Sequence, residues 1–294
     1  MSRAPASATG VVNALSIDVE EWFQVGAFER VIRPGDWDGL ESRVALNTGR
    51  ALDIFAEAGV RATFFTLGWV AQRQPALIRR IVAEGHELAS HGWGHERVSG
   101  FTPAAFRADL RRARAMLEDR GGVAVRGYRA PSFSIGKANA WALEVLAEEG
   151  YAYSSSVAPF GHDHYGWPGF PRFAHRPLPG SALVEVPVTT ARVAGRWLGF
   201  GGGFFRLLPY ALAAHCMRQV NQRDRQPAIF YFHPWEIDPG QPRVAGAPLK
   251  SRLRHYTNLG VMEAKLRRLL ADFAWDRMDR LFLDEPAPVM ARAA

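Results

Sequence analysis

The chain has 294 residues, of which 48% are hydrophobic and 22% are charged, the composition of a globular protein with one barrel-sized domain or two smaller ones. The formal net charge is +7, but no long basic run occurs, so nucleic acid is not an expected partner. No apolar run approaches the ~18 residues that span a bilayer, and the single cysteine, Cys216, excludes an internal disulfide.

Strand-like and helix-like segments alternate along the chain. The expected strands are residues 11–17, 61–66, 86–90, 125–128, 151–154, 183–188 and 228–232. The expected helices are residues 41–58, 75–84, 102–120, 138–149, 208–222 and 258–273. A stretch rich in glycine and proline, residues 159–181, is predicted to be a loop. This alternation predicts a parallel α/β fold, and we expect a single domain over residues 1–285 followed by a flexible tail at 286–294.

Polar residues recur where the predicted strands end. They are Asp18, Thr66, His91, Arg129, Ser154 and His233. In a closed parallel barrel the strand ends share one face, and that face carries the catalytic sites of such folds. Six polar residues at successive ends therefore indicate one shared site.

The sequence SHGWGH places His91 and His95 four residues apart, just after a predicted strand. If this segment forms a turn of helix, both imidazoles lie on one side, as a metal site requires. The pair alone fits two ordinary surface histidines better, because a short motif is weak evidence by itself. In SIDVEE, Asp18 and Glu20 point the same way along a strand, and a buried carboxylate needs a partner. In isolation, a capping Asp18 and a solvent-facing Glu20 explain these two acids as well as a functional site does.

Two further segments offer groups that handle charge and protons. In YRAPSF, Arg129 can orient a carboxylate through paired hydrogen bonds, although a structural salt bridge is the commoner role of an arginine. In FYFHPWE, His233 ends an apolar strand, where a histidine is more often structural, but where an imidazole could also protonate a leaving group. Tyr231 and Trp235 beside it could line a sugar-binding groove.

Taken together, these segments resemble the NodB-type polysaccharide deacetylases, the fourth family of carbohydrate esterases. SIDVE, SHGWGH, YRAPSF, YSSSV and FYFH correspond to the five motifs of that family, and the resemblance spans roughly residues 12–283. GGGFFRLLPY, FYFHPWEIDP and SRLRHYTNLG resemble the subgroup encoded with exosortase and PEP-CTERM exopolysaccharide loci. The resemblance implies a distorted (β/α) barrel of about seven parallel strands, a bound divalent metal (usually Zn²⁺), and removal of N-acetyl groups from a glycan.

The resemblance also implies a role for each motif residue. His91 and His95 would be metal ligands. Asp18 would be the general base, Arg129 would orient it, and His233 would be the general acid. The residues expected to contact the substrate are Trp93, Tyr128, Ser132, Phe133, Tyr231 and Trp235, with a backbone N–H near Ser132 stabilising the oxyanion.

The first motif departs from the family pattern, because Val19 stands where a second aspartate is usual. A valine cannot bind metal, and Glu20 points the same way as Asp18 with a longer reach. We therefore expect Glu20 to be the third metal ligand and Asp18 to be the base. In the alternative arrangement Asp18 binds the metal, while Glu20 caps the strand or faces solvent.

The fourth motif departs as well, because Ser154 stands where an aspartate is usual. The group that fixes the His233 tautomer is therefore open among three carboxylates: Asp163, Glu185 and Glu236.

The expected function is metal-dependent N-deacetylation of N-acetylhexosamine residues in a bacterial exopolysaccharide or its lipid-linked precursor. Two alternatives are hydrolysis of a small amide or imide on the same scaffold and a catalytically impaired glycan-binding protein, the latter prompted by Ser154. The first ten residues lack the apolar region of a signal peptide, so we expect a cytoplasmic location. The basic surface would allow loose attachment to the inner membrane.

Overall fold

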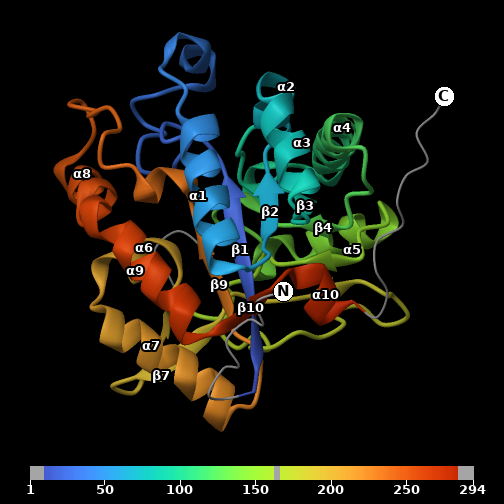
Figure 1. The fold of residues 1–294 in the computed structure, drawn as a ribbon. Coiled ribbons are helices and arrows are strands. Elements are labelled where there is room, and N and C mark those ends of the chain that lie inside the picture. The colour runs from blue at the N-terminus through green and yellow to red at the C-terminus, as the bar shows by residue number, and fades with distance from the viewer. Residues whose placement is uncertain (1–9, 162–165, 284–294) are drawn as a thin grey trace.

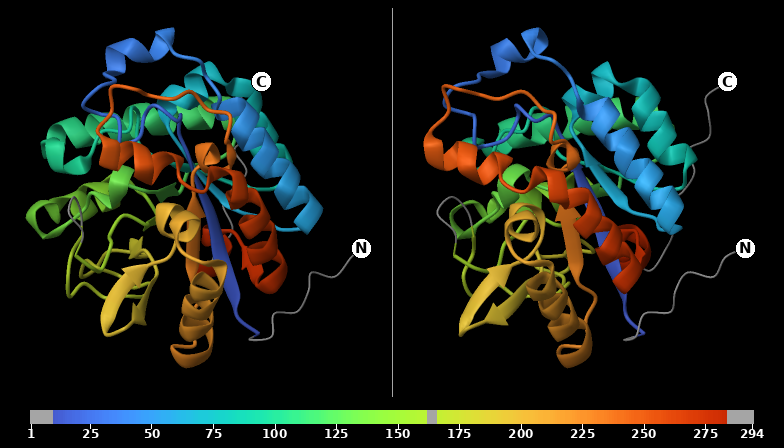
Figure 2. Two further views of the ribbon diagram at one scale, coloured as in Figure 1. Left: turned by 90° about the vertical axis from the view of Figure 1, so that its left-hand side faces the viewer. Right: turned by 60° about the vertical axis from the view of Figure 1, so that its left-hand side comes forward.

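The computed structural model describes residues 10–161 and 166–283, so the predicted tail at 286–294 and Asp163 lie outside the described residues. A curled sheet of eight strands, all paired in parallel, forms the centre of this part of the chain, with helices packed around it (Figures 1 and 2). The strands are β1 (Val12–Val19), β2 (Thr63–Thr66), β3 (Glu87–Ser90), β4 (Gly127–Tyr128), β5 (Tyr153–Ser154), β6 (Val184–Glu185), β9 (Ile229–Phe232) and β10 (Ala274–Asp276). The predicted parallel barrel of about seven strands is confirmed.

Strand β1 is the centre of this sheet. Its second half pairs with β2 on one side, its middle pairs with β9, and its first residues pair with β10. From β2 the sheet continues through β3, β4 and β5 to β6. Within the described ranges β6 and β9 share no strand pairing; nearby, the Ile229 N–H donates to Thr189 Oγ1 at 2.6 Å. The barrel is therefore incomplete, with its gap beside β9.

The helices pack outside the sheet. They are α1 (Val44–Ala58), α2 (Gly68–Arg73), α3 (Pro75–Ala83), α4 (Pro103–Gly121), α5 (Trp141–Glu148), α6 (Gly202–Leu207), α7 (Tyr210–Arg218), α8 (Leu249–Tyr256), α9 (Leu259–Asp272) and α10 (Met278–Phe282). Local signals set several of these ends. Helix α1 stops at Gly59, whose φ of +68° suits a residue without a Cβ. Helix α4 begins after Thr102, whose side chain accepts a hydrogen bond from the Ala105 N–H at 3.2 Å.

Short elements are the main difference from the sequence prediction. Helices α2, α6, α8 and α10 have eight residues or fewer, too few to show a helical period. The hairpin of β7 (Thr190–Val193) and β8 (Arg196–Gly199) was also missed. Its two turn residues, Ala194 and Gly195, both have positive φ, but Ala-Gly is a weaker turn signal than Asn-Gly or Asp-Gly.

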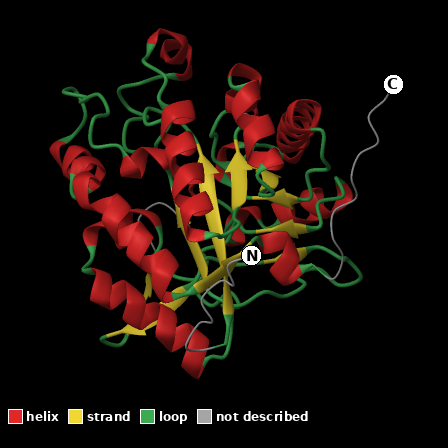
Figure 3. Cartoon of the chain, viewed as in Figure 1, coloured by secondary structure: helices red, strands yellow, loops and turns green. Residues whose placement is uncertain are grey.

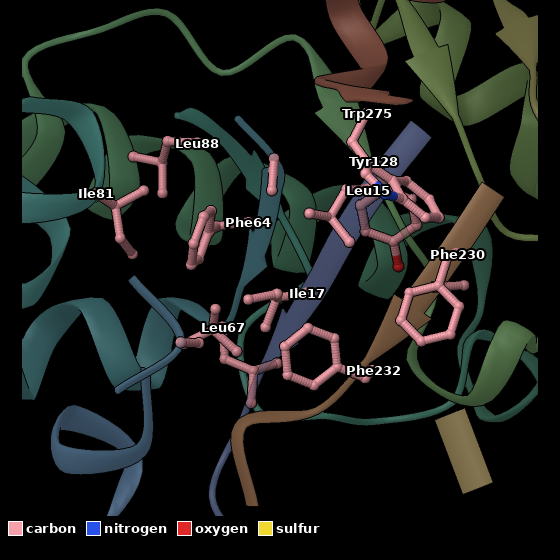
Figure 4. Close-up of a cluster of buried hydrophobic side chains, with 14 of the residues drawn as sticks. Leu15, Ile17, Phe64, Leu67, Ile81, Leu88, Tyr128, Phe230, Phe232 and Trp275 are labelled. Atoms are coloured by element: carbon pink, nitrogen blue, oxygen red, sulfur yellow. The ribbon is translucent and has the colours of Figure 1, made fainter. Parts of the chain in front are cut away.

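Side chains along β1 point alternately into the core and toward the site. Leu15, Ile17 and Val19 belong to the large core cluster between sheet and helices, together with Phe64 and Phe232 (Figure 4 labels all of these except Val19). Because successive side chains in a strand point to opposite faces, Asp18 points away from these helices. Val19 is thus a core residue.

The carboxyl ends of the strands define the edge where the polar residues gather. The arrowheads of β1 and β2 point to the top of the view in Figures 1 and 3, and His91, Arg129 and His233 each follow the last residue of a strand. No helix in the described part of the chain is long and apolar enough to cross a membrane.

Candidate active site

A buried ion pair joins Asp18 of β1 to Arg129, the residue after β4. The Nη1 group of Arg129 donates to Asp18 Oδ1 at 2.6 Å and to Ser16 Oγ at 2.9 Å. Its other nitrogens donate to the carbonyl and hydroxyl of Ser155, and the guanidinium lies 4.0 Å from the ring centroid of Phe65. The arginine is therefore fixed from several sides, and it holds one oxygen of Asp18 while the other, Oδ2, faces His233.

Three side chains converge next to this pair. Glu20, His91 and His95 each offer one ligand atom, and the three atoms lie within 4.8 Å of one another. His91 donates from Nδ1 to the Arg129 carbonyl at 2.8 Å, which leaves its Nε2 free to bind a cation. Glu20 also accepts a hydrogen bond at Oε1 from the indole N–H of Trp235 at 3.0 Å.

The segment that carries the two histidines is a loop, so the turn of helix considered for 91–95 does not form. Gly92 has a φ of +77° and His95 a φ of +60°, which interrupt any helix. Backbone bonds from Gly68 to Gly92 and from Trp69 to Trp93 anchor this loop to α2. The loop still places the two imidazole rings 5.5 Å apart, centroid to centroid.

The donor set fits a divalent metal. Glu20 Oε2 lies 2.6 Å from His95 Nε2, and the pair does not have the geometry of a standard hydrogen bond. Two polar atoms that converge in this way are arranged as ligands of a common third atom would be. Two imidazole nitrogens and a carboxylate oxygen are a set that suits zinc and other divalent transition metals.

Charge states at the cluster agree with this chemistry. Burial alone would raise the pKa of Glu20, but the nearby imidazoles of His95 and His233 outweigh it and hold that pKa well below its usual range. Burial lowers the pKa of His91 to about 4, so its imidazole is neutral at pH 7. An ionised carboxylate and a neutral imidazole are the forms that bind metal.

His233 lies across the site from the ion pair. Its Nε2 is 3.8 Å from Glu20 Oε1 and 3.9 Å from Asp18 Oδ2. Its Nδ1 donates to Glu236 Oε2 at 3.2 Å, and its backbone N–H donates to the same oxygen at 3.1 Å. Burial would lower the pKa of His233, but the carboxylates of Glu20 and Glu236 raise it to about 9. The imidazole thus faces the site with Nε2 and carries a proton to give.

Of the three carboxylates considered for orienting His233, the structure places Glu236 in contact. Glu236 is fully buried, and its other oxygen accepts from Arg206 Nε at 3.1 Å. Glu185 instead accepts from the backbone N–H groups of Ser156 and Val157 at 2.8 and 2.9 Å. Ser154 supports the same loop through its hydroxyl, which donates to Ser156 Oγ at 2.8 Å.

A cavity of about 270 Å³ opens onto these groups. Its wall includes the acids Asp18 and Glu20 and the histidines His91, His95 and His233. Four residues expected to contact a substrate also line it: Ser132, Phe133, Tyr231 and Trp235. Ser132 and Phe133 both have positive φ, a strained backbone that is typical of functional loops.

The structure places the other two expected substrate contacts elsewhere. Trp93 packs against Gly68 of α2, where an added Cβ would lie 2.6 Å from the indole, and Arg112 stacks on its ring. Tyr128 is buried in the core beside Phe106. Neither lines the cavity, so the structure does not support these two substrate contacts, because motif membership does not say which way a side chain points.

Two residues that the sequence did not single out, and one that it did, support the site. Trp235 was expected to bind substrate, but it also fixes Glu20. Asp109 of α4 accepts the Trp93 N–H at 3.2 Å and so holds the histidine loop, and burial raises the pKa of Asp109 to about 6. Arg206 of α6 is buried against Glu236. Asp109 and Arg206 lie far from the motifs along the sequence, so no sequence signal pointed to these two contacts.

The comparisons with known proteins divide the chain in two. Residues 38–154 match the family model for polysaccharide deacetylases, and residues 155–283 match a domain of unknown function, DUF3473. Residues 38–154 thus resemble polysaccharide deacetylases over less than half of the chain. This matched segment carries His91, His95 and Arg129, whereas Asp18 and Glu20 precede it and His233 lies in the second match.

Curated relatives match part of the same region. A chitooligosaccharide deacetylase of Bradyrhizobium sp. (strain ANU 289) is 37% identical over 111 residues, covering 37% of this chain and 48% of that protein. A chitooligosaccharide deacetylase of Sinorhizobium fredii (strain NBRC 101917 / NGR234) is 42% identical over 89 residues, covering 29% and 40%. The chain spans about half the length, or less, of these curated deacetylases.

Two solved structures share the fold of the whole chain. A Mycobacterium smegmatis protein classed as a polysaccharide deacetylase has a TM-score of 0.61 at 22% identity, covering 100% of this chain and 98% of that one. Puue allantoinase also has a TM-score of 0.61, at 14% identity, covering 94% and 90%. At these identities the likeness establishes the fold of polysaccharide deacetylases and not a shared substrate.

Proposed function

We propose that this protein is a metal-dependent hydrolase that removes N-acetyl groups from N-acetylhexosamine residues of a glycan and releases acetate. One observation carries the proposal. One cavity at the carboxyl ends of the strands contains the cluster of Glu20, His91 and His95. The same cavity contains Asp18, which is paired with Arg129, and His233, which is paired with Glu236. Metal hydrolysis of an amide needs each of these parts: a metal, a base and an acid.

The residues divide the work as follows. Glu20, His91 and His95 would hold a divalent metal, which would supply a Lewis acid to polarise the amide oxygen and make a water molecule nucleophilic near pH 7. Asp18, oriented by Arg129, accepts the proton of the attacking water at Oδ2. His233, turned toward the cavity by Glu236, donates its Nε2 proton to the departing amine nitrogen.

The finer assignments are part of the same proposal. We take the metal to be Zn²⁺, since two imidazoles and one carboxylate are a common catalytic zinc set. The substrate is a bacterial exopolysaccharide or its lipid-linked precursor, which the resemblance of the C-terminal motifs to PEP-CTERM-locus proteins supports. The protein then works in the cytoplasm, with loose attachment to the inner membrane.

Residues 1–285 are proposed to form one domain. The support comes from contacts that join the two family matches. Strand β1, which precedes both, pairs with β2 of the first match and with β9 and β10 of the second, and the Met278 N–H donates to Thr63 Oγ1 of the first match at 2.8 Å.

Acetate release is the direct test. The metal-loaded protein should release acetate from N-acetylglucosamine oligomers, and a chelator should abolish the reaction. His91→Ala should lose bound metal and turnover together, whereas His215→Ala, which alters an exposed histidine of α7, should lose neither. Turnover that survives thorough chelation would end the metallohydrolase proposal.

The same assay separates the two alternatives. A small-amide hydrolase would act on a purine-derived amide such as allantoin and leave the oligomers intact. A catalytically impaired protein would bind the oligomers and hydrolyse neither substrate, as measured by acetate release for the oligomers and by ring opening for allantoin.

A further inference from the structure

A second cavity adjoins the catalytic one. It has a volume of about 410 Å³, and the two cavities share five wall residues: Val25, Gly26, Ser132, Trp235 and Arg254. The remaining wall of the second cavity comes largely from the segment after β1 and from α8. In Figure 1, α8 lies in the upper half of the view, and the carboxyl ends of β1 and β2 point toward this half. A ligand with one end at the metal ligands would therefore extend into this second cavity.

The second cavity is strongly basic. Its wall contains the side chains of five lysines and arginines but only one acid, Glu29. Glu29 is already paired with Arg97 at 2.7 Å, and the buried Arg206 is paired with Glu236. The other three cations are Arg30, Lys250 and Arg254, and none of them has an acidic partner within the described ranges.

What sets these three cations apart is their place in one concave wall. Elsewhere on the surface some arginines pair with acids, as Arg50 and Arg73 do, and others, such as Arg79 and Arg252, have no acidic partner within the described ranges. Helix α8 adds to the positive potential, because Pro248, Lys250 and Ser251 at its amino end lie in the cavity wall, where the helix dipole is positive. Like charges gathered in a concave wall repel one another and attract an anion.

We propose that this second cavity binds an anionic group carried by the glycan, a phosphate or a carboxylate near the sugar that loses its acetyl group. The inference rests on the proposed deacetylase function and narrows its substrate to an acidic glycan. Arg254 is the central contact because it lines both cavities, and Lys250 and Arg30 complete the anion site. A guanidinium binds either anion through paired hydrogen bonds.

The test compares three substrates of equal length with the metal-loaded protein. One is a neutral N-acetylglucosamine tetramer, one carries a phosphate at its reducing end, and one carries a glucuronic acid residue at an end. An anionic substrate should have a kcat/KM about threefold to tenfold above that of the neutral tetramer at low salt. The phosphate arm represents a lipid-phosphate-linked glycan, and the uronic acid arm represents an acidic polysaccharide.

The variant Lys250→Gln/Arg254→Gln should lose this preference, so that its kcat/KM for the anionic substrates equals its kcat/KM for the neutral tetramer. Its backbone anchor is retained, because Arg206 binds α8 through the main-chain oxygen of Arg254 at 2.7 Å. Arg252→Gln is the matched control, since Arg252 is an exposed arginine of the same helix that lies outside both cavity walls. The control should keep the preference.

A binding measurement separates this inference from the proposed function. Metal-free protein is titrated calorimetrically with inorganic pyrophosphate, which should bind the wild type and Arg252→Gln but not the double variant. Equal kcat/KM for all three substrates, or an equal loss in Arg252→Gln, would overturn the inference. If no substrate yields acetate, the proposed function fails and the pyrophosphate titration alone decides whether the anion site exists.

Discussion

Replacing Glu236 with glutamine is expected to separate the orientation of His233 from the stability of the fold. The carboxylate accepts two hydrogen bonds from His233 at one oxygen and one from Arg206 at the other, and it is fully buried. Glutamine has nearly the same shape, but it carries no charge and presents an NH₂ group to one of these donors. The imidazole then loses its fixed orientation and Arg206 loses its counterion.

Both effects have an expected size. Removing the partner of a buried charge costs about 3–5 kcal/mol, and we expect the lower end because the amide keeps one acceptor oxygen. Removing a group that orients a catalytic side chain lowers activity by about 10- to 100-fold, which corresponds to about 1.4–2.7 kcal/mol in the activation barrier. Glu236→Gln should therefore retain its metal, keep KM, lose kcat by that factor and unfold at a lower urea concentration.

Asp238→Asn provides the control for stability alone. Asp238 lies two residues further on, is buried, and pairs with Arg43 at 2.6 Å without contacting His233. Its substitution should lower the free energy of unfolding and leave kcat unchanged. Steady-state acetate release, metal content and urea unfolding of both variants decide the question. If Glu236→Gln loses stability but keeps wild-type kcat, the assignment of Glu236 as the positioning residue for His233 is wrong.

Three other predictions follow from the site and the core. Glu20→Gln should weaken metal binding and Asp18→Asn should retain metal and lose turnover, as measured by elemental analysis and acetate release; the reverse pattern would exchange the two roles. His233→Ala should keep its metal and lose about 10²- to 10⁴-fold in turnover, and loss of metal would make His233 a ligand instead. Acid should weaken the fold through His86, whose Nδ1 accepts the Ala62 N–H at 3.1 Å and whose pKa is lowered by burial to about 4. The neutral imidazole stabilises the fold fully above pH ~6.5, and up to about 3 kcal/mol of the free energy of unfolding is lost as the pH falls toward 4. The free energy of unfolding of His86→Gln in urea should therefore depend less on pH than that of the wild type.

The sequence predicted the edge of the sheet where the site lies, and the reason is geometric. In a parallel sheet all carboxyl ends meet at one edge, so Asp18, His91, Arg129 and His233 had to lie close together once their strands were identified. Period-two alternation likewise predicted that Val19 would turn away from Asp18, and Val19 lies in the core. These expectations depended only on local pattern and strand direction.

Contacts that depend on packing between distant segments could not be predicted from the sequence. Glu236, Glu185 and Asp163 were equal candidates for orienting His233, because only the tertiary fold shows that Glu185 is used by the loop after β5. Trp93 was misplaced for a similar reason. Its indole occupies space that exists because Gly68, 25 positions earlier, has no side chain.

The position of β1 has a consequence for how the chain is made. Ser16 donates a hydrogen bond to the main-chain oxygen of Phe230, 214 positions further along the chain, so β1 leaves the ribosome long before its neighbour β9 is synthesised. At ~5–20 residues per second this wait lasts roughly 10–40 s, during which Leu15 and Ile17 cannot be covered as in the finished protein. Such non-local pairing slows folding and exposes an unpaired strand edge to other chains. Nascent chains that stop before β9 should therefore aggregate or require a chaperone, and early termination is expected to be more damaging to solubility than the loss of the last helix.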